Sequence, residues 1–233
     1  MAKSGSKINK SEIKNHDLLS VNEIREIFDI LRGLYGEDVG TELEYYNNYQ
    51  LLVAIMLSAQ ATDRSVNKVS RILFSKLKTP KDALELGFER INEIVKTINY
   101  HNVKSRHIVK MSEQLIAKHN GIVPDTFEEL VNLSGVGRKT ANLVLSLAFK
   151  KNRIAVDTHC FRVANRLGIV KADNVLETEK QLIKNVPESL HRSINNLLIP
   201  FGREYCKAIN PRCKECPFNK ICRQNSFKKL RKK

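Results

Sequence analysis

The amino-acid sequence predicts an all-α protein built as two interlocked helical lobes. Apolar residues recur at spacings of three and four along most of the chain, which is the period of a helix with one buried face. Capping residues and glycines stand at the ends of these segments. No convincing stretch alternates apolar and polar residues as a half-buried strand would. No internal repeat and no long linker is present, which favours interlocked lobes over two separate domains.

Three helices are expected between residues 63 and 121. Their apolar faces consist of Val66, Val69, Leu73 and Leu77, then Ile91, Ile94 and Ile98, then Ile108, Met111 and Leu115. Asp63 precedes the first face and is placed to cap its first turn. Gly121 follows the third face and is expected to close that helix, as glycines commonly do.

A short helix, a tight turn and a second helix come next. Thr126-Phe-Glu-Glu129 has the S/T-x-x-E form of a capping box and predicts a short helix that ends near Leu133. Ser134-Gly-Val-Gly137 predicts a turn bracketed by glycines, and the second helix runs from about Arg138 to Phe149. Backbone N–H groups at the start of that helix can bind phosphate, although the same residues can also form a plain helix-helix turn.

Three further helices lead to the C-terminal segment. The first follows Asp157 and is expected to stop at Gly168. Its apolar face contains Phe161, Ala164 and Leu167. The other two cover about residues 176–186 and 188–201.

The charge of the chain points to a polyanionic partner. The formal net charge is +15 and the isoelectric point is near 9.7, and residues 203–233 alone carry eleven Lys or Arg against two Glu. Nucleic acid is the leading candidate. An anionic membrane is less favoured, because no strongly basic amphipathic helix with an aromatic face is found and no apolar run could span a bilayer. Residues 1–20 lack the apolar core of a secretion signal and are expected to form a mobile basic arm.

Four cysteines near the C-terminus predict a metal or iron-sulfur centre. Their spacing is C-x6-C-x2-C-x5-C, at Cys206, Cys213, Cys216 and Cys222. Disulfides are not expected without a secretion signal, which leaves zinc or an iron-sulfur cluster. Zinc ribbons normally contain two C-x2-C knuckles and this pattern contains one, so the iron-sulfur cluster is favoured over zinc. The fifth cysteine, Cys160, is expected to be a small buried core residue.

Two residues near the hairpin are candidate catalytic groups. Lys139 lies in the first turn of the helix after the hairpin, where the helix dipole disfavours a charged ammonium and so favours a nucleophilic amine that can form a Schiff base. Asp157 can cap the next helix, and a carboxylate there can also stabilise a developing cation or accept a proton. Lys139 could equally be one surface lysine among many.

Four sequence blocks together resemble the endonuclease III family of iron-sulfur helix-hairpin-helix DNA glycosylases with AP-lyase activity. They are Leu57-Ser-Ala-Gln-Ala-Thr-Asp63, Leu133-Ser-Gly-Val-Gly-Arg-Lys-Thr-Ala-Asn142, Ala155-Val-Asp-Thr-His159 and the 6-2-5 cysteine spacing. The resemblance covers about residues 21–225, in the order and at the separations of the family.

The resemblance implies a two-lobed helix-hairpin-helix DNA glycosylase fold. A six-helix lobe would span residues 41–150, and residues 21–40 with 151–225 would form the iron-sulfur lobe, followed by a basic tail at 226–233. A damaged base would be flipped into the cleft between the lobes. The implied partner is double-stranded DNA with oxidised bases or abasic sites. The protein is expected to be a monomer without membrane contact, located in the cytoplasm with chromosomal DNA, or in the nucleus if the source is eukaryotic.

The resemblance also implies roles for single residues. Lys139 would attack C1′, displace an oxidised pyrimidine and hold the sugar as a Schiff base while β-elimination cuts the strand 3′ to it, with Asp157 assisting both steps. The four cysteines would hold a 4Fe-4S cluster, with zinc as the alternative. The implied DNA contacts are Gln60, Tyr100, Gly135, Gly137, Arg138 and His159.

The chain departs from the family pattern near two of these positions. Gln60 would fill the space that the flipped base leaves, although it could also be an ordinary surface residue. Tyr100 stands where a leucine is typical of the second residue that enters the duplex, and His101 stands where tyrosine is frequent, which leaves the preference for the opposite base open. Ser134 replaces a common proline and is expected to loosen the start of the turn slightly.

Two alternative functions remain at this point. A mismatch glycosylase of the adenine-removing branch would generally lack the hairpin lysine and carry an additional C-terminal domain. A non-catalytic DNA-binding or redox-sensing protein would bind DNA without cutting it at an abasic site.

Overall fold

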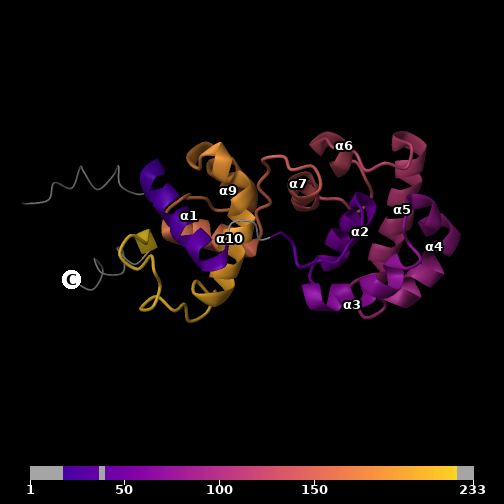
Figure 1. Ribbon diagram of the computed structural model, residues 1–233, viewed down its shortest axis with the longest axis horizontal. Helices are drawn as coiled ribbons and strands as arrows, with labels where there is room; N and C mark the ends of the chain where they lie inside the picture. Colours follow the sequence, from indigo (N-terminus) through magenta and orange to yellow (C-terminus); the bar gives the residue numbers. More distant parts are fainter. Residues whose placement is uncertain (1–17, 37–39, 225–233) are drawn as a thin grey trace, which may run out of the picture. The chain divides into compact units, whose positions relative to one another are not determined.

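The computed structural model describes residues 18–36 and 40–224, and these are mostly helical without a β-strand, as the sequence predicted. Contacts between Cα atoms divide the chain into two compact units (Figure 1). We call Gly40–Ala155 the hairpin unit. The cysteine unit combines the N-terminal residues up to Val39 with Val156 and all that follows. The cysteine unit is therefore assembled from the two ends of the chain, while the hairpin unit is continuous.

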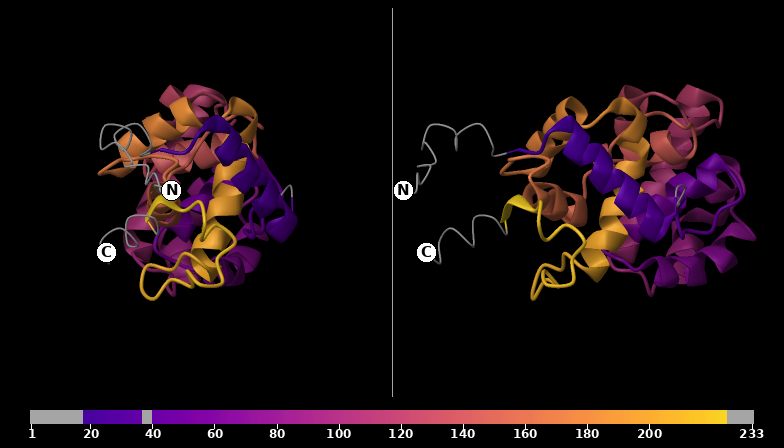
Figure 2. Two further views of the ribbon diagram at one scale, coloured as in Figure 1. Left: turned by 90° about the vertical axis from the view of Figure 1, so that its left-hand side faces the viewer. Right: turned by 60° about the vertical axis from the view of Figure 1, so that its left-hand side comes forward.

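The hairpin unit contains six helices. They are α2 (Asn48–Ser58), α3 (Asp63–Phe74), α4 (Pro80–Val95), α5 (His101–His119), α6 (Phe127–Val131) and α7 (Arg138–Leu147). Nine of the eleven residues of α2 are buried, and this helix packs against α3, α5 and α7. The helix α4 lies along α5 (Figures 1 and 2). The apolar faces predicted from the sequence form the single core of this unit.

Several helix ends differ from the sequence prediction for local reasons. Thr62, rather than Asp63, caps α3, because its side chain accepts a hydrogen bond from the Ser65 backbone N–H. The helix α5 ends one residue earlier than expected, at the left-handed Asn120, which precedes Gly121. The helix α4 is kinked at Gly87, whose φ is 70°.

The cysteine unit contains α1 (Val21–Tyr35), α8 (Thr158–Leu167), α9 (Val175–Asn185), the short 3-10 helix η2 (Glu188–Leu190) and α10 (His191–Glu204). The helix α10 packs against α1 and α8 (Figure 2), and α8 also contacts α9. Gly168 ends α8 in the left-handed conformation, as predicted. The segment expected as one helix from residue 188 to 201 is instead η2 followed by α10.

The described part of the chain begins just before α1. Leu19, which the sequence assigned to the N-terminal arm, is buried, and its N–H donates to the Gly168 carbonyl at 2.8 Å. Ser20 forms a capping box with Glu23 at the start of α1. Residues 1–17 of the expected arm and the basic tail at 226–233 lie outside the described residues. None of the described helices is long and apolar enough to cross a membrane.

Candidate functional site

The turn between α6 and α7 contains two glycines in different surroundings. Gly135 has a φ of 77°, and a Cβ at this position would lie 2.8 Å from both Cβ of His107 and Cε of Met56. Gly137 has a φ of −89° and is the N-cap of α7. A Cβ on Gly137 would meet no heavy atom within 4 Å. Gly135 is therefore required by the fold, whereas the space beside Gly137 is open.

Side chains from α5 hold this turn in place. His107 Nδ1 lies 2.8 Å from Ser134 Oγ, and the Ser134 backbone N–H donates to Gln114 Oε1 at 2.7 Å. Gln114 Nε2 donates in turn to the Asn132 carbonyl. Ser134 bonds α5 through both its hydroxyl and its backbone N–H, which a proline would lack, and the slight loosening of the turn relative to proline stays a prediction.

The first residues of α7 are exposed. Arg138 is the first residue of the helix and Lys139 the second, so Lys139 occupies the first turn as predicted. The N-cap Gly137 offers no side chain to bond the backbone at this helix start. The Arg138 guanidinium lies 4.8 Å from the centroid of the Phe127 ring, and Arg153 lies 5.8 Å from the same ring. Two cations are thus fixed beside the hairpin.

Gln60 and Tyr100 are exposed on two other loops of the hairpin unit. Gln60 follows α2, and Tyr100 precedes α5 with 64% of its surface exposed. Both have left-handed backbone conformations, with φ of 57° and 60°. The Asn99 side-chain amide donates to the Gln60 carbonyl at 2.8 Å, which ties the two loops together. The side chains of both residues are therefore exposed to solvent, while the hydrogen bond from Asn99 restrains the backbone of the two loops.

Asp157 is the N-cap of α8 in the cysteine unit. Its Oδ1 accepts a hydrogen bond from the Cys160 backbone N–H at 2.8 Å, which confirms the capping role predicted from the sequence. His159, one residue into α8, has its Nδ1 3.0 Å from Arg162 Nη2. Cys160 is fully buried, as predicted for a core residue.

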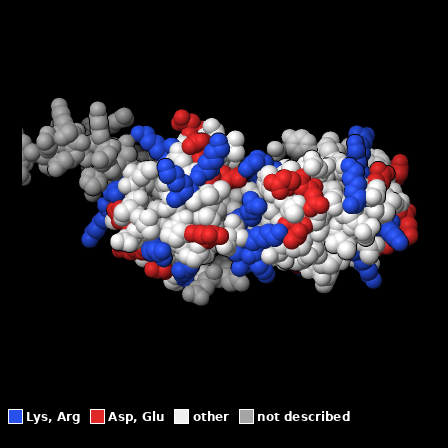
Figure 3. Space-filling model, turned by 90° about the horizontal axis from the view of Figure 1, so that it is seen from above, with Lys and Arg blue, Asp and Glu red and all other residues white. Residues whose placement is uncertain are grey.

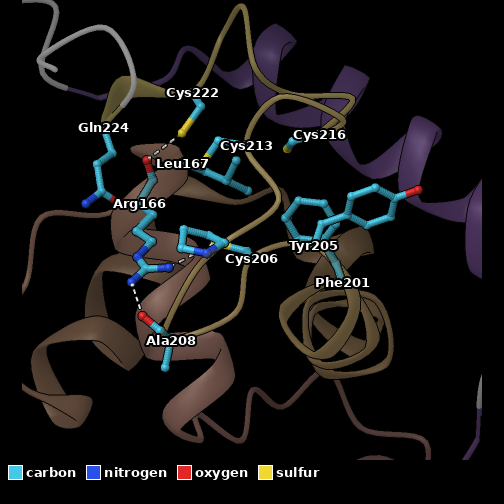
Figure 4. Close-up of a pocket in the computed structure, with 11 residues that line it drawn as sticks. Arg166, Leu167, Phe201, Tyr205, Cys206, Ala208, Cys213, Cys216, Cys222 and Gln224 are labelled. Carbon is cyan, nitrogen blue, oxygen red and sulfur yellow. Dashed lines mark hydrogen bonds between the residues drawn. The ribbon is translucent and has the colours of Figure 1, made fainter. Parts of the chain in front are cut away.

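The four C-terminal cysteines line one cavity of about 200 Å³ between α8, α10 and the loop that follows α10 (Figure 4). Two arginines on α8 hold this loop. Arg162 donates to the carbonyls of Cys206 and Gly202, and Arg166 donates to those of Lys207 and Ala208. The fully buried Phe218 packs edge-on against Phe201, with ring centroids 5.1 Å apart. The cavity is thus held by both helices and by a core aromatic.

The chemistry of this cavity suits a cationic group. Burial raises the pKa of Cys216 to about 11, and the thiolates of the other three cysteines raise it as well, against the backbone N–H of Phe218, which lowers it. Four thiols this close together would all ionise only around a positive centre. Among residues 18–36 and 40–224, no three Cys, His, Asp or Glu side chains are grouped so as to hold a single metal ion. Four thiols around one cavity are a donor set that either an iron-sulfur cluster or zinc can take.

Charge is distributed over both units. On the face seen in Figure 3, Lys and Arg side chains occur on each unit together with Asp and Glu. Five of the basic residues lie at 225–233, outside the described part. The net positive charge is therefore partly a property of segments that the structure does not describe.

Sequence reasoning missed two residues that the structure brings to the Gln60 loop, Asn99 and Lys104. Lys104 Nζ donates to the carbonyls of Leu57 and Ala59 at the end of α2. A signal for Lys104 was present, because it falls at the helical spacing of the apolar face that continues with Ile108. A lysine on the buried face of a helix needs a specific set of acceptors.

Comparisons with known proteins agree with this geometry. The family model described as HhH-GPD superfamily base excision DNA repair protein matches residues 53–188. The chain is 47% identical over 208 residues to Endonuclease III of Bacillus subtilis strain 168, which covers 89% of this chain and 94% of that protein. Endonuclease III of Haemophilus influenzae is 45% identical over 182 residues, covering 78% of this chain and 86% of that protein.

Solved structures match over most of the chain. A structure of a trapped endonuclease III-DNA covalent intermediate has a TM-score of 0.84 at 41% identity, and covers 91% of this chain and 100% of that one. A thermostable thymine-DNA glycosylase matches with a TM-score of 0.77 at 24% identity, over 88% of this chain and 98% of that one. The latter supports the fold alone.

Proposed function

The chain belongs to the endonuclease III family, within the HhH-GPD superfamily of base excision DNA repair proteins, and we propose that it is a bifunctional DNA glycosylase and AP lyase that uses Lys139 as its nucleophile. The observation that carries this proposal is the exposed lysine in the first turn of α7, directly after the glycine hairpin. A relative of this family has been trapped in a covalent complex with DNA, as a lysine nucleophile requires.

The reaction has two stages at one sugar. The neutral Lys139 amine attacks C1′ of the damaged nucleotide, and the bond from C1′ to the base breaks as the base leaves with its electron pair. The ring then opens to a protonated Schiff base between Nζ and C1′. Loss of a proton from C2′ expels the 3′ phosphate by β-elimination, and water finally releases the lysine. No external oxidant, reductant or nucleotide is needed.

Asp157 assists this chemistry from the N-terminus of α8. Its carboxylate already accepts the Cys160 N–H, so its backbone and side chain are fixed by the cap. A fixed carboxylate stabilises the positive charge that develops on the sugar and can accept a proton.

The four cysteines hold a 4Fe-4S cluster in the cavity beside α8 and α10. The support is the set of four thiols around one cavity of about 200 Å³, together with the need for a positive centre between them. The cluster, when bound, supplies a structural cross-link rather than a step of the reaction. It fixes the loop that contains Lys207, Arg212 and Lys214.

The substrate is double-stranded DNA with an oxidised pyrimidine or an abasic site, and the protein acts as a monomer on chromosomal DNA. Support comes from the hairpin, where the exposed start of α7 and the cation Arg138 suit contacts with phosphate that do not depend on base sequence. Gly135, Gly137 and His159 belong to this proposed DNA surface, as do Gln60 and Tyr100. We assign the two lobes of the family to the hairpin and cysteine units.

Borohydride trapping tests the assignment of Lys139. Borohydride reduces a Schiff base to a stable amine, so the wild-type protein mixed with abasic duplex should give an adduct that survives denaturing electrophoresis. Lys139→Ala should give none. Lys81→Ala is the matched control, because Lys81 is also exposed and is also the second residue of a helix, α4. A persistent adduct in Lys139→Ala, or an equal loss in Lys81→Ala, would contradict the assignment.

Asp157→Asn separates the catalytic role from the capping role. An asparagine oxygen can accept the Cys160 N–H as well as aspartate does, so the unfolding free energy should change by less than about 0.5 kcal/mol. The rate of base release should fall at least tenfold, because the amide carries no charge. An unchanged rate would leave Asp157 as a cap only.

The cluster is tested on the purified holoprotein by its visible absorption and by iron and sulfide analysis. A brown protein with about four iron and four sulfide per chain is expected. A colourless protein that contains one zinc per chain would contradict the cluster assignment and support the zinc alternative.

A further inference from the structure

Gln60 and Tyr100 are two of the four exposed non-glycine residues of the hairpin unit that have a positive φ, and Asn120 and Lys150 are the others. Gln60 has a φ of 57° and Tyr100 a φ of 60°. A left-handed conformation is uncommon for a residue other than glycine, asparagine or aspartate, and it is an outlier for a bulky side chain such as tyrosine. Strain of this kind persists only where the surroundings hold it.

Lys104 on α5 holds the Gln60 loop (residues 59–62) through hydrogen bonds to the end of α2. This side chain is only 8% exposed, and its Nζ donates to the Leu57 carbonyl at 2.8 Å and the Ala59 carbonyl at 2.6 Å. The last carbonyls of α2 have no partner within the helix and carry partial negative charge, so an ammonium is favourable there. Burial lowers the pKa of Lys104. A buried ammonium with two backbone acceptors fixes the backbone on the helix side of Gln60.

Asn99 also holds this loop. Its amide donates to the Gln60 carbonyl at 2.8 Å, and Asn99 directly precedes Tyr100 in the turn before α5. That turn is held by the His101 N–H, which donates to the Ile98 carbonyl, and by His101 Nδ1, which lies 2.7 Å from Asn92 Oδ1. The two strained residues are thus joined through one side chain, and both loops are anchored to α5.

We propose that Asn99 and Lys104 are positioning residues that hold Gln60 and Tyr100 as one preformed two-pronged element, which enters the DNA duplex as a unit when the damaged nucleotide leaves it. This inference rests on the proposed function. Its physical basis is that a loop already fixed in its bound conformation loses less conformational entropy on binding. The free protein already has the strained loop conformation, so no conformational change is needed on binding and the affinity for damaged DNA is higher.

A double-mutant cycle on DNA affinity tests this coupling. The probe is a duplex that contains a tetrahydrofuran abasic analogue, which has no aldehyde carbon and so cannot be cleaved by the lyase reaction. Asn99→Ala should weaken binding about threefold to tenfold, as expected for one lost hydrogen bond in the loop. In a Gln60→Ala background the same substitution should cause a smaller further loss than in the wild type, because only the Tyr100 prong is left to be positioned. Binding to undamaged duplex should not change.

Asn67→Ala is the matched control for the loss of an asparagine bridge. The Asn67 amide also donates to a backbone carbonyl, that of Glu42, and its Oδ1 accepts the Glu44 N–H. This substitution removes a comparable loop contact in the same unit, and the ratio of affinities for abasic and undamaged duplex should stay at the wild-type value.

Lys104 is tested by a pair of variants. Lys104→Met removes the donors and should lower the same affinity ratio, and Lys104→Arg should restore it, since a guanidinium can donate to two carbonyls. If Lys104→Met does not fold, the double-mutant cycle on Asn99 and Gln60 still tests whether the two loops act as one element.

Additive losses in the cycle, an equal loss on undamaged duplex, or no loss in Asn99→Ala would each overturn the proposal. Borohydride trapping by the wild-type protein is scored separately. A failed cycle in a protein that forms the adduct rejects the coupling alone, whereas no adduct in the wild type rejects the proposed function.

Discussion

The two hairpin glycines should respond to alanine in opposite ways. Gly135→Ala forces an L-residue into a φ of 77° and places a Cβ 2.8 Å from Cβ of His107. Gly137→Ala at a φ of −89° meets no heavy atom within 4 Å. We expect the first substitution to destabilise the fold and the second to leave the fold nearly intact while weakening contact with DNA.

The magnitude for Gly135→Ala follows from two terms. The left-handed conformation costs about 1–2 kcal/mol for an L-residue. The overlap adds about 1–3 kcal/mol, because Met56 can move its terminal methyl group but His107 Cβ is fixed to the backbone of α5. The free energy of unfolding should therefore fall by about 2–5 kcal/mol. Gly137→Ala should cost less than about 1 kcal/mol, since alanine is a somewhat poorer N-cap than glycine.

Urea unfolding followed by circular dichroism measures the first effect, and binding to the uncleavable abasic duplex measures the second. Gly137→Ala should bind about threefold to tenfold more weakly, because its methyl group occupies the open space beside the start of α7. The reasoning is refuted if Gly135→Ala unfolds within about 1 kcal/mol of the wild type, or if the two variants lose the same stability.

Three further predictions concern other contacts. Burial alone would raise the pKa of Glu23, but hydrogen bonds from Ser20 and the Arg223 guanidinium outweigh burial and lower this pKa, so the stabilisation is present above about pH 4.5 and lost as the pH falls further. Glu23→Gln should thus lower the unfolding free energy by about 1 kcal/mol at pH 7. Urea titrations of both proteins should show that this difference becomes smaller below about pH 4. Tyr49→Phe removes a buried hydroxyl 2.7 Å from Ser112 Oγ and should cost about 1 kcal/mol in the same assay, and a neutral result would mean that water replaces the bond. Cys213→Ala should lose visible absorption and DNA affinity before lyase chemistry, which trapping at saturating protein concentration can show. An unchanged affinity with abolished lyase activity would contradict a structural role.

The hairpin was predictable because its signals are local. The glycines at 135 and 137 and the apolar face of α7 all lie within one short segment, and each indicates the same structure. The same holds for Gly168, which ends α8 in the left-handed conformation. The cysteine pattern is also local, since all four residues lie in one loop.

Features that depend on tertiary packing were harder to predict. The helix α2 was not identified, because nine of its eleven residues are buried and it therefore lacks the polar face that reveals a helical period. Thr62 and Asp63 are both acceptable caps, and only the path of the preceding loop selects Thr62. The contacts of Asn99 and Lys104 with the Gln60 loop join residues about forty positions apart. The helical spacing can place Lys104 on a buried face, but no local pattern can indicate which carbonyls it bonds.

The discontinuous cysteine unit constrains how the protein is made. The helix α1 is synthesised before the hairpin unit, whereas α10, against which α1 packs, is synthesised after it. At a synthesis rate of about 5–20 residues per second, the intervening hairpin unit takes on the order of ten seconds to appear. During this time the hairpin unit can fold, while the apolar face of α1 has no α10 to pack against. The Glu23–Arg223 ion pair and the cysteine loop complete the unit only after residue 223 has been synthesised. A chain that fails to recruit α1 should therefore be an early target for proteolysis.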